Sequence, residues 1–262
     1  MRILLIRHGD PDYEHDTLTP KGVREAKLLS ERISKLDVKA FYCSPLGRAQ
    51  DTASYTLDKM NRSAGILCPV FSIPANQGIG DLGQKTIRMI DIIADAGYTI
   101  WQILPLQMTG PTHSPYQTYS SFAGDPIYIN LDRLCEMGLL TQSSIVNCNK
   151  FKDFVEYDKI REFKESYFQK AFKVFKKEFD SFKEDFEAFK RDAFWLEDWS
   201  AYSLFKSFYN GAPWFEWEDE YKNWPENRDI DLDDYKDEIF YIEFLQFVFY
   251  KQLDEIFGIN IN

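Results

Sequence analysis

The stretch Y-T-I-W-Q-I-L-P-L-Q-M-T-G-P-T-H-S-P-Y-Q-T-Y-S-S-F-A-G-D-P, from Tyr98 to Pro126, decides how the rest of the chain is interpreted. Its first part, Thr99 to Leu104, is a short apolar run between Gly97 and Pro105, which is typical of a buried strand. The remainder is rich in Gly, Pro, Thr, Ser and Tyr and has neither a strand period nor a helix period, which indicates a surface loop. A buried strand that leads into a long loop is how α/β barrels present ligand-contacting residues.

The loop offers residues suited to sugar binding. Tyr116 and Tyr119 can stack on the face of a sugar ring, and Ser114 and Gln117 can hydrogen-bond its hydroxyls. The alternative is a structural loop whose tyrosines pack on the domain. Composition alone favours that alternative.

Five ordered motifs extend this interpretation to most of the chain. They are R-S-A-G-I-L (62–67), G-I-G-D-L-G (78–83), W-Q-I-L-P-L (101–106), S-P-Y-Q (114–117) and F-A-G-D-P (122–126). Together they resemble the N-terminal part of the 4-α-glucanotransferases (amylomaltases), from about Met60 to the C-terminus. The resemblance implies a partial (β/α)8 barrel with a helical insertion at about 150–225. It also implies retaining transfer of an α-1,4-glucan segment to an acceptor sugar, maltodextrin as a partner, and Ser114, Tyr116 and Gln117 as glucan contacts.

Two positions of the loop depart from the pattern of that family. His113 stands where Asn or Asp is more frequent, and Asp125 stands where Asn is common before the proline. A third expectation concerns catalysis. Retaining transfer needs a carboxylate nucleophile and a carboxyl acid/base about 5 Å apart. The resemblance implies that both belong to barrel strands later than the third, which we expect to begin at Gly258. We therefore expect this chain to lack them and to require a missing C-terminal barrel fragment, with no cofactor.

The first 57 residues carry a different pattern. A predicted strand at Ile3–Ile6 leads into Arg7-His8-Gly9, a predicted helix spans Val23–Leu36, and a predicted strand at Lys39–Tyr42 leads into S-P-L-G-R-A-Q-D-T-A (44–53). This pair of motifs resembles the histidine phosphatase (phosphoglycerate mutase-like) superfamily and implies a truncated three-layer α/β piece.

The second resemblance implies a role for each residue of its motifs. His8 is the residue that would be phosphorylated, and Arg7 and Arg48 would hold the phosphate. The family also needs a second histidine and an acidic proton donor. The other histidines are His15 and His113, and neither fits, so we expect the phosphatase site to be inactive.

We therefore predict two units, 1–59 and 60–262, joined without a Gly/Ser-rich or Pro-rich linker. The main hypothesis is a 4-α-glucanotransferase by descent. The alternatives are phosphatase or phosphomutase chemistry at His8, and a truncated fusion that binds glucan without catalysis.

Composition limits the other function classes. The net charge of -11 argues against nucleic acid and anionic membrane surfaces as partners. The four cysteines form no C-x-x-C pair, which indicates reduced thiols and predicts no metal site. The apolar run after Met1 is too short for a signal peptide, and no stretch is long enough to span a membrane, so we predict a cytoplasmic protein.

The C-terminal half is predicted to be largely helical. The region Phe151–Phe208 is dense in charge, and its phenylalanines recur at spacings of four and three, which places them on one helical face. We predict a helix pair broken near Asp180, an acidic loop at Glu218–Asp237 and a final helix at Asp237–Phe257. The phenylalanines of the stripe are Phe168, Phe172, Phe175, Phe179, Phe182, Phe186 and Phe189.

Overall fold

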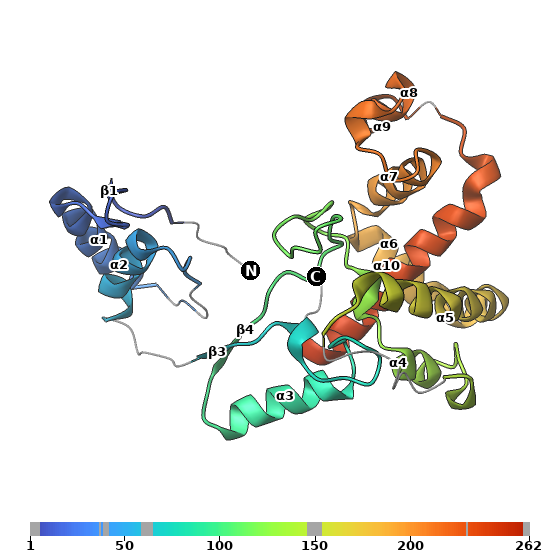
Figure 1. Cartoon of the computed structure of the whole chain (residues 1–262), viewed down its shortest axis with the longest axis horizontal. Helices are drawn as coiled ribbons and strands as arrows, with labels where there is room; N and C mark the ends of the chain where they lie inside the picture. The colour runs from blue at the N-terminus through green and yellow to red at the C-terminus, as the bar shows by residue number, and fades with distance from the viewer. Residues whose placement is uncertain are drawn as a thin grey trace. The chain divides into compact units, whose positions relative to one another are not determined.

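The computed structural model describes residues 6–36, 38, 42–58, 65–145, 154–228 and 230–258 (Figure 1). Contacts divide the chain into two compact units, Met1–Ala64 and Gly65–Asn262, which we call unit 1 and unit 2. The junction predicted at Met60 falls on residues 59–64, outside the described part of the chain, as does most of the strand predicted to begin at Gly258.

Unit 1 contains two packed helices and a short hairpin. Helix α1 (Pro20–Ile33) packs against α2 (Gly47–Leu57), and β1 (Pro11–Asp12) pairs antiparallel with β2 (Thr17–Leu18). The Thr19 hydroxyl caps α1 by accepting a hydrogen bond from Gly22 N at 3.1 Å. The helix therefore begins three residues before the predicted Val23 and ends at Ile33 rather than Leu36. The strands predicted at 3–6 and 39–42 lie mostly on residues 3–5 and 39–41, which are not described.

Unit 2 begins with one βαβ unit. Strand β3 (Gly65–Leu67) pairs in parallel with β4 (Ile100–Gln102), and α3 (Gln84–Asp95) connects them. The Trp101 indole Nε1 donates to the Cys68 carbonyl oxygen at 2.8 Å, which fixes the end of one strand to the other. The predicted strand–helix–strand order is confirmed.

Both strands are shorter and less buried than predicted. The apolar run that begins at Gly65 is a strand only as far as Leu67, and Val70–Ser72 forms a 3-10 helix. The predicted strand Thr99–Leu104 is reduced to Ile100–Gln102. In a two-stranded sheet each strand is paired on one edge, so residues beyond the paired ones have no ladder to hold them extended. Leu67, at the end of β3, is 58% exposed.

Four long helices dominate unit 2 (Figure 1). They are α5 (Tyr157–Lys177), α6 (Phe179–Asp192), α7 (Leu196–Phe208) and α10 (Lys236–Phe257). Three of them, α5, α6 and α10, line its main core, and α7 contributes to a second, smaller core. The phenylalanine stripe lies on α5 and α6, which confirms the predicted helix pair, and it packs against α10. The break between the two helices falls at Glu178 rather than at Asp180. Phe175 is fully buried among six other phenylalanines whose ring centres lie within 6 Å of its own, so truncating such a ring costs about 3–5 kcal/mol.

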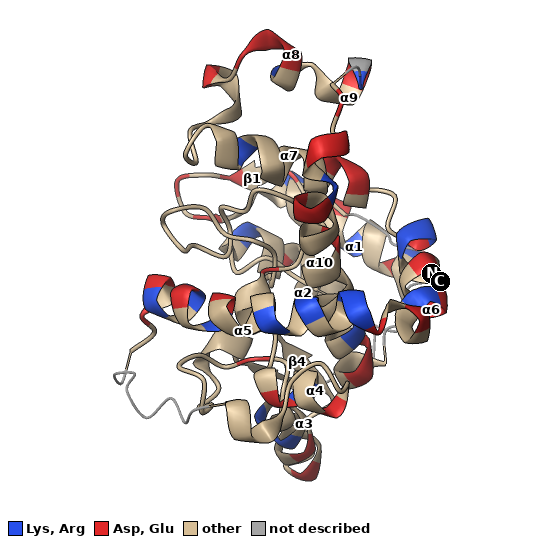
Figure 2. Cartoon of the chain, turned by 90° about the vertical axis from the view of Figure 1, so that its right-hand side faces the viewer, with Lys and Arg blue, Asp and Glu red and all other residues tan. Residues whose placement is uncertain are grey.

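The predicted acidic loop is partly helical. Residues 218–237 contain α8 (Asp219–Lys222), α9 (Trp224–Asn227) and a 3-10 turn at Asp233–Tyr235. Acidic side chains gather on α8 and on the first turn of α10 (Figure 2). Trp217 and Trp224 are buried against α7, whereas Trp214 is 56% exposed. The remaining short elements are 3-10 turns at Pro126–Tyr128 and Gln142–Ser144 and helix α4 (Leu131–Glu136).

Candidate functional site

The segment that follows β4 folds back on itself as an irregular hairpin. Two antiparallel bridges pair Gln107 with Gly124 and Thr109 with Thr118. Met108 N donates to Ala123 O at 3.1 Å, and Tyr119 N donates to Met108 O at 3.0 Å. We call residues 107–124 the hairpin loop. Its backbone is therefore hydrogen-bonded across its width, although its sequence has no strand period.

The tip of the hairpin loop brings together the three residues predicted to contact glucan. Gln117 N donates to Ser114 O at 3.0 Å, and Tyr116 N donates to Ser114 Oγ at 3.4 Å. Thr112 Oγ1 donates to Gln117 Oε1 at 2.7 Å. The Tyr116 side chain is 75% exposed, so its ring presents a face to solvent from a turn with defined hydrogen bonds.

An arginine from α5 holds the base of the hairpin loop. Arg161 donates from Nη1 and Nη2 to the two carboxylate oxygens of Asp125, each at 2.6 Å. Its Nη2 also lies 3.4 Å from Thr109 Oγ1, on the outgoing strand. Burial lowers the pKa of Arg161, but the hydrogen bonds and charge of Asp125 raise it to above its ordinary value, so the guanidinium stays charged.

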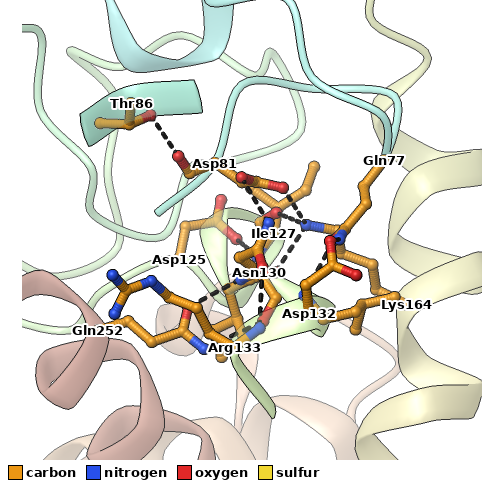
Figure 3. Close-up of polar contacts among 12 residues, drawn as sticks. Gln77, Asp81, Thr86, Asp125, Ile127, Asn130, Asp132, Arg133, Lys164 and Gln252 are labelled. Atoms are coloured by element: carbon orange, nitrogen blue, oxygen red, sulfur yellow. Dashed lines mark hydrogen bonds and ion pairs between the residues drawn. The ribbon is translucent and has the colours of Figure 1, made fainter. Parts of the chain in front are cut away.

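Helix α10 holds the returning strand through amide side chains. Gln246 accepts a hydrogen bond from Gly124 N at 2.8 Å and donates to Gly124 O at 3.0 Å. Gln252, six residues later, makes the same pair of contacts with Asn130 (Figure 3). A Cβ on Gly124 would lie 2.2 Å from the Phe249 ring, so only glycine allows this close approach.

A buried polar cluster lies next to this base (Figure 3). Lys164 is fully buried and donates to the carbonyl oxygens of Ile127 and Ile129, both at 2.7 Å. Its Nζ lies 3.8 Å from Asp81 Oδ2, and Asn130 Nδ2 donates to Asp81 Oδ1 at 2.9 Å. Burial raises the pKa of Asp81, which Lys164 opposes. This cluster fixes the backbone that follows the hairpin loop.

Sequence reasoning missed Arg161, Lys164 and Gln246. Arg161 and Lys164 lie three positions apart, on the same face of α5 as Ile160 and Tyr167, inside a stripe otherwise filled by apolar residues. That interruption, by a buried lysine and a partly buried arginine, is the signal that could have found them.

In unit 1 the structure places His8 and Arg48 against the same ring. His8 lies edge-on to Tyr13 with ring centres 6.5 Å apart, and the Arg48 guanidinium lies 5.3 Å from the centre of that ring. Gly9 N donates to Thr52 Oγ1 of α2 at 3.0 Å, which ties the R-H-G motif to the second motif. Arg48 is paired with Asp16. The Arg7 side chain is exposed, and the structure shows no contact between it and His8 or Arg48.

Within the described residues, no group of three His, Cys, Asp or Glu side chains could hold a metal ion. No helix of the described chain is both long and apolar enough to cross a membrane.

Comparison with protein families identifies both parts of the chain. A family model described as 4-alpha-glucanotransferase matches residues 68–258, which include the hairpin loop, α5 and α10. The chain belongs to the 4-α-glucanotransferase family. A model described as histidine phosphatase superfamily (branch 1) matches residues 3–67. Both resemblances predicted from the motifs are confirmed.

Individual relatives of the 4-α-glucanotransferase family agree. The chain is 38% identical to the 4-alpha-glucanotransferase of Synechocystis over 205 residues, which cover 76% of this chain and 40% of that relative. The Aquifex aeolicus 4-alpha-glucanotransferase is 34% identical over 199 residues, covering 74% of this chain and 39% of the relative. The amylomaltase from Streptococcus agalactiae, solved in complex with acarbose, superposes with a TM-score of 0.69 at 28% identity over 75% of this chain and 40% of that one.

The chain thus spans about 40% of the length of the relatives that it matches. The fold is mixed α/β with helices dominant, as the structural neighbour also shows.

Proposed function

We propose that unit 2 is the N-terminal portion of a 4-α-glucanotransferase and that the tip of its hairpin loop binds an α-1,4-glucan. On this proposal β3, α3 and β4 are the first βαβ unit of a (β/α)8 barrel, and the hairpin loop follows the carboxyl end of β4. The observation that carries the proposal is the exposed ring of Tyr116, held in one turn with Ser114 and Gln117. The acarbose-bound neighbour supports it.

The chain by itself is proposed to bind glucan without transferring it. Among the described residues of unit 2, the buried carboxylates of Asp81 and Asp125 are engaged by Lys164 and Arg161. A retaining enzyme needs two carboxyl groups about 5 Å apart that face the sugar, one to attack and one to donate a proton. Carboxylates that already neutralise buried cations are poorly suited to either role. The catalytic pair of the complete enzyme is therefore assigned to its C-terminal barrel strands.

The binding proposal is tested by titrating the full chain with maltoheptaose in a calorimeter. Tyr116→Ala is expected to weaken binding about tenfold, or about 1.4 kcal/mol, because the flat apolar face for the sugar is removed. The matched control is Tyr98→Ala, since Tyr98 is an exposed tyrosine of unit 2 outside the hairpin loop. Equal affinities of Tyr116→Ala and the unaltered chain would contradict the proposal, as would an equal loss in Tyr98→Ala.

A second candidate function, phosphoryl transfer at His8, is favoured by one contact. His8 Nδ1 lies 2.8 Å from the Gly9 carbonyl oxygen, which can only accept a hydrogen bond. In the neutral imidazole this contact places the proton on Nδ1 and leaves the lone pair on Nε2, the arrangement that a nucleophile requires. Against this, Arg48 is already paired with Asp16, so a phosphate would have to compete with that carboxylate.

Phosphohistidine trapping separates the two candidates. In the step tested, Nε2 bonds to phosphorus while the ester P–O bond breaks, and p-nitrophenyl phosphate is suitable because nitrophenolate leaves without a proton donor. A stoichiometric burst of nitrophenolate that is lost in His8→Ala would support this candidate. Identical behaviour of the two proteins would remove it.

A further inference from the structure

Two residues of the segment 107–125, His113 and Asp125, contact the same helix. The His113 ring stacks on Tyr157 of α5, with ring centres 4.5 Å apart and planes 6° from parallel. His113 Nε2 also lies 3.7 Å from Asp158 Oδ1. Asp125 makes its two hydrogen bonds to Arg161, one turn further along α5. The tip and the base of the hairpin loop are therefore both attached to the start of α5.

One face of α5 follows the path of this segment. Tyr157, Arg161 and Lys164 have the spacing i, i+4 and i+7, which places them on one side of the helix. Tyr157 contacts the tip, Arg161 contacts the base, and Lys164 binds the carbonyl oxygens of Ile127 and Ile129 beyond it. These polar residues lie in a helix whose other buried positions are apolar or aromatic. Their shared target is the hairpin loop and its continuation.

The contacts at the base of the hairpin loop explain why an aspartate at position 125 matters. A guanidinium and a carboxylate form two parallel hydrogen bonds, and the Asp125 side chain is only 1% exposed, so water competes little for them. An asparagine at this position keeps one acceptor oxygen but brings no charge to neutralise Arg161. His113 requires a left-handed backbone, with φ of 53°, to place its ring on Tyr157. Both residues thus favour one position of the loop over others.

We propose that Tyr157 and Arg161 are positioning residues for glucan recognition: they hold the hairpin loop so that Tyr116 presents its ring in one orientation. This inference rests on the proposed function of the tip. Neither residue is assigned a contact with sugar. Helix α10 contacts the returning strand through Gln246 and Tyr250, whereas α5 contacts the outgoing strand, the tip and Asp125.

The test combines amide hydrogen exchange with maltoheptaose titration on the full chain. In Arg161→Ala the amides that bond across the hairpin loop, those of Met108, Gly110 and Tyr119, are expected to exchange at least tenfold faster. Glucan affinity is expected to fall about tenfold. Tyr157→Ala should weaken binding several-fold, whereas Tyr157→Phe keeps the stacked ring and should bind like the unaltered chain. Lys176→Ala is the matched control, since Lys176 lies on α5 and pairs with Asp237 instead of the loop.

Three outcomes would overturn the inference. The first is a hairpin loop that exchanges no faster in Arg161→Ala. The second is faster exchange spread evenly over unit 2, which would mean a general structural role. The third is a loosened hairpin loop with unchanged glucan affinity, in a chain where Tyr116→Ala does lose affinity. If Tyr116→Ala binds glucan normally, the proposed function fails. Amide exchange in Arg161→Ala is measured without sugar, so faster exchange there would still show that Arg161 holds the hairpin loop, and the two failures can be told apart.

Discussion

Each unit of this chain uses an arginine–aspartate pair to tie a loop to a helix, and the two pairs differ in their surroundings. In unit 1, Arg48 of α2 pairs with Asp16, whose side chain is 45% exposed. In unit 2, Arg161 of α5 pairs with Asp125, whose side chain is 1% exposed. Arg161 uses two N–H groups on one carboxylate, whereas Asp16 divides its oxygens between Arg48 and Gly47 N.

The same arginine–aspartate pairing therefore contributes differently to stability in the two units. Water competes with an exposed pair, so such pairs contribute little to stability. A buried pair that loses one partner leaves an uncompensated charge in the interior, which is strongly destabilising. The hairpin loop of unit 2 is thus fixed, while the loop that carries Asp16 is attached more weakly.

The largest effect is expected from breaking the buried pair. Asp125→Ala leaves the Arg161 guanidinium, whose side chain is 25% exposed, without its carboxylate and should lower the free energy of unfolding of unit 2 by about 3 kcal/mol, measured by urea denaturation. Asp185→Ala provides the control, because Asp185 pairs with Lys251 while its side chain is 59% exposed. A loss in Asp125→Ala no larger than that of Asp185→Ala would show that the two environments do not differ as claimed.

The close approach of the hairpin loop to α10 gives the next effect. Gly124→Ala places a Cβ 2.2 Å from the Phe249 ring and should cost about 1–3 kcal/mol through overpacking. Gly110→Ala, in the same loop, would place its Cβ 3.5 Å from the nearest atom, an ordinary contact, and should be nearly neutral. Thermal denaturation of the two variants measures the contrast. Equal melting temperatures would mean that the returning strand is not pressed against α10.

Asp254 is the opposite case to Asp125, because its carboxyl is partly buried and no cation pairs with it among the described residues. Burial raises the pKa of Asp254 to about 6, with a smaller contribution from Glu255, and its Oδ1 is buried without a hydrogen-bond partner among the described residues. The folded state binds the proton more tightly than the unfolded state, whose pKa is near 3.8. The stabilisation is therefore complete below pH 3.8 and is lost as pH rises through about 6.

Asp254→Asn should remove that dependence. The variant is expected to be more stable than the unaltered chain above pH 6, by about 1 kcal/mol after allowance for partial exposure, and equally stable below pH 4. Urea denaturation at a series of pH values measures the difference. A variant that is destabilised equally at all pH values would show that the carboxyl is held by a contact rather than penalised by burial.

The smallest effect is expected from the exposed pair. The Gly47 N–H and the Arg48 guanidinium hold the pKa of Asp16 below its usual value, so their stabilisation is present above that value and is lost as pH falls. Arg48→Ala should shift the denaturation midpoint of unit 1 slightly at pH 7 and not at all at pH 2. A shift as large as that of Asp125→Ala would remove the contrast between the two pairs.

The parts of the fold that could be predicted from sequence are those set by local periodicity. The phenylalanine spacing predicts the helix pair because neighbours on one helical face are three or four residues apart. Strand lengths could not be predicted in the same way. The apolar run through Leu104 is long enough for a longer strand, but pairing along β3 extends only from Ile100 to Gln102. Strand ends are decided by the partner strand and not by the run itself.

The candidate site was predicted only as far as its exposed tip. Tyr116, Ser114 and Gln117 were found because they lie within a motif of four residues. Arg161 was missed because its partner, Asp125, is 36 residues away and lies on a different element. A local pattern cannot reveal a pair that forms only when α5 packs beside the loop. The departures at His113 and Asp125 were visible in the sequence, but their common contact with α5 was not.

The central claim is that this chain carries a positioned glucan-contacting loop without the carboxylate pair that performs transfer. Incubating the purified full chain with maltotriose, and following glucose and longer maltodextrins, tests this claim most directly. The account predicts no glucose above that formed with Tyr116→Ala, and activity only when a C-terminal barrel fragment of a relative is supplied. Disproportionation by the chain alone, lost in Tyr116→Ala, would contradict it by showing that a catalytic pair is assembled from acidic residues assigned here to structural roles.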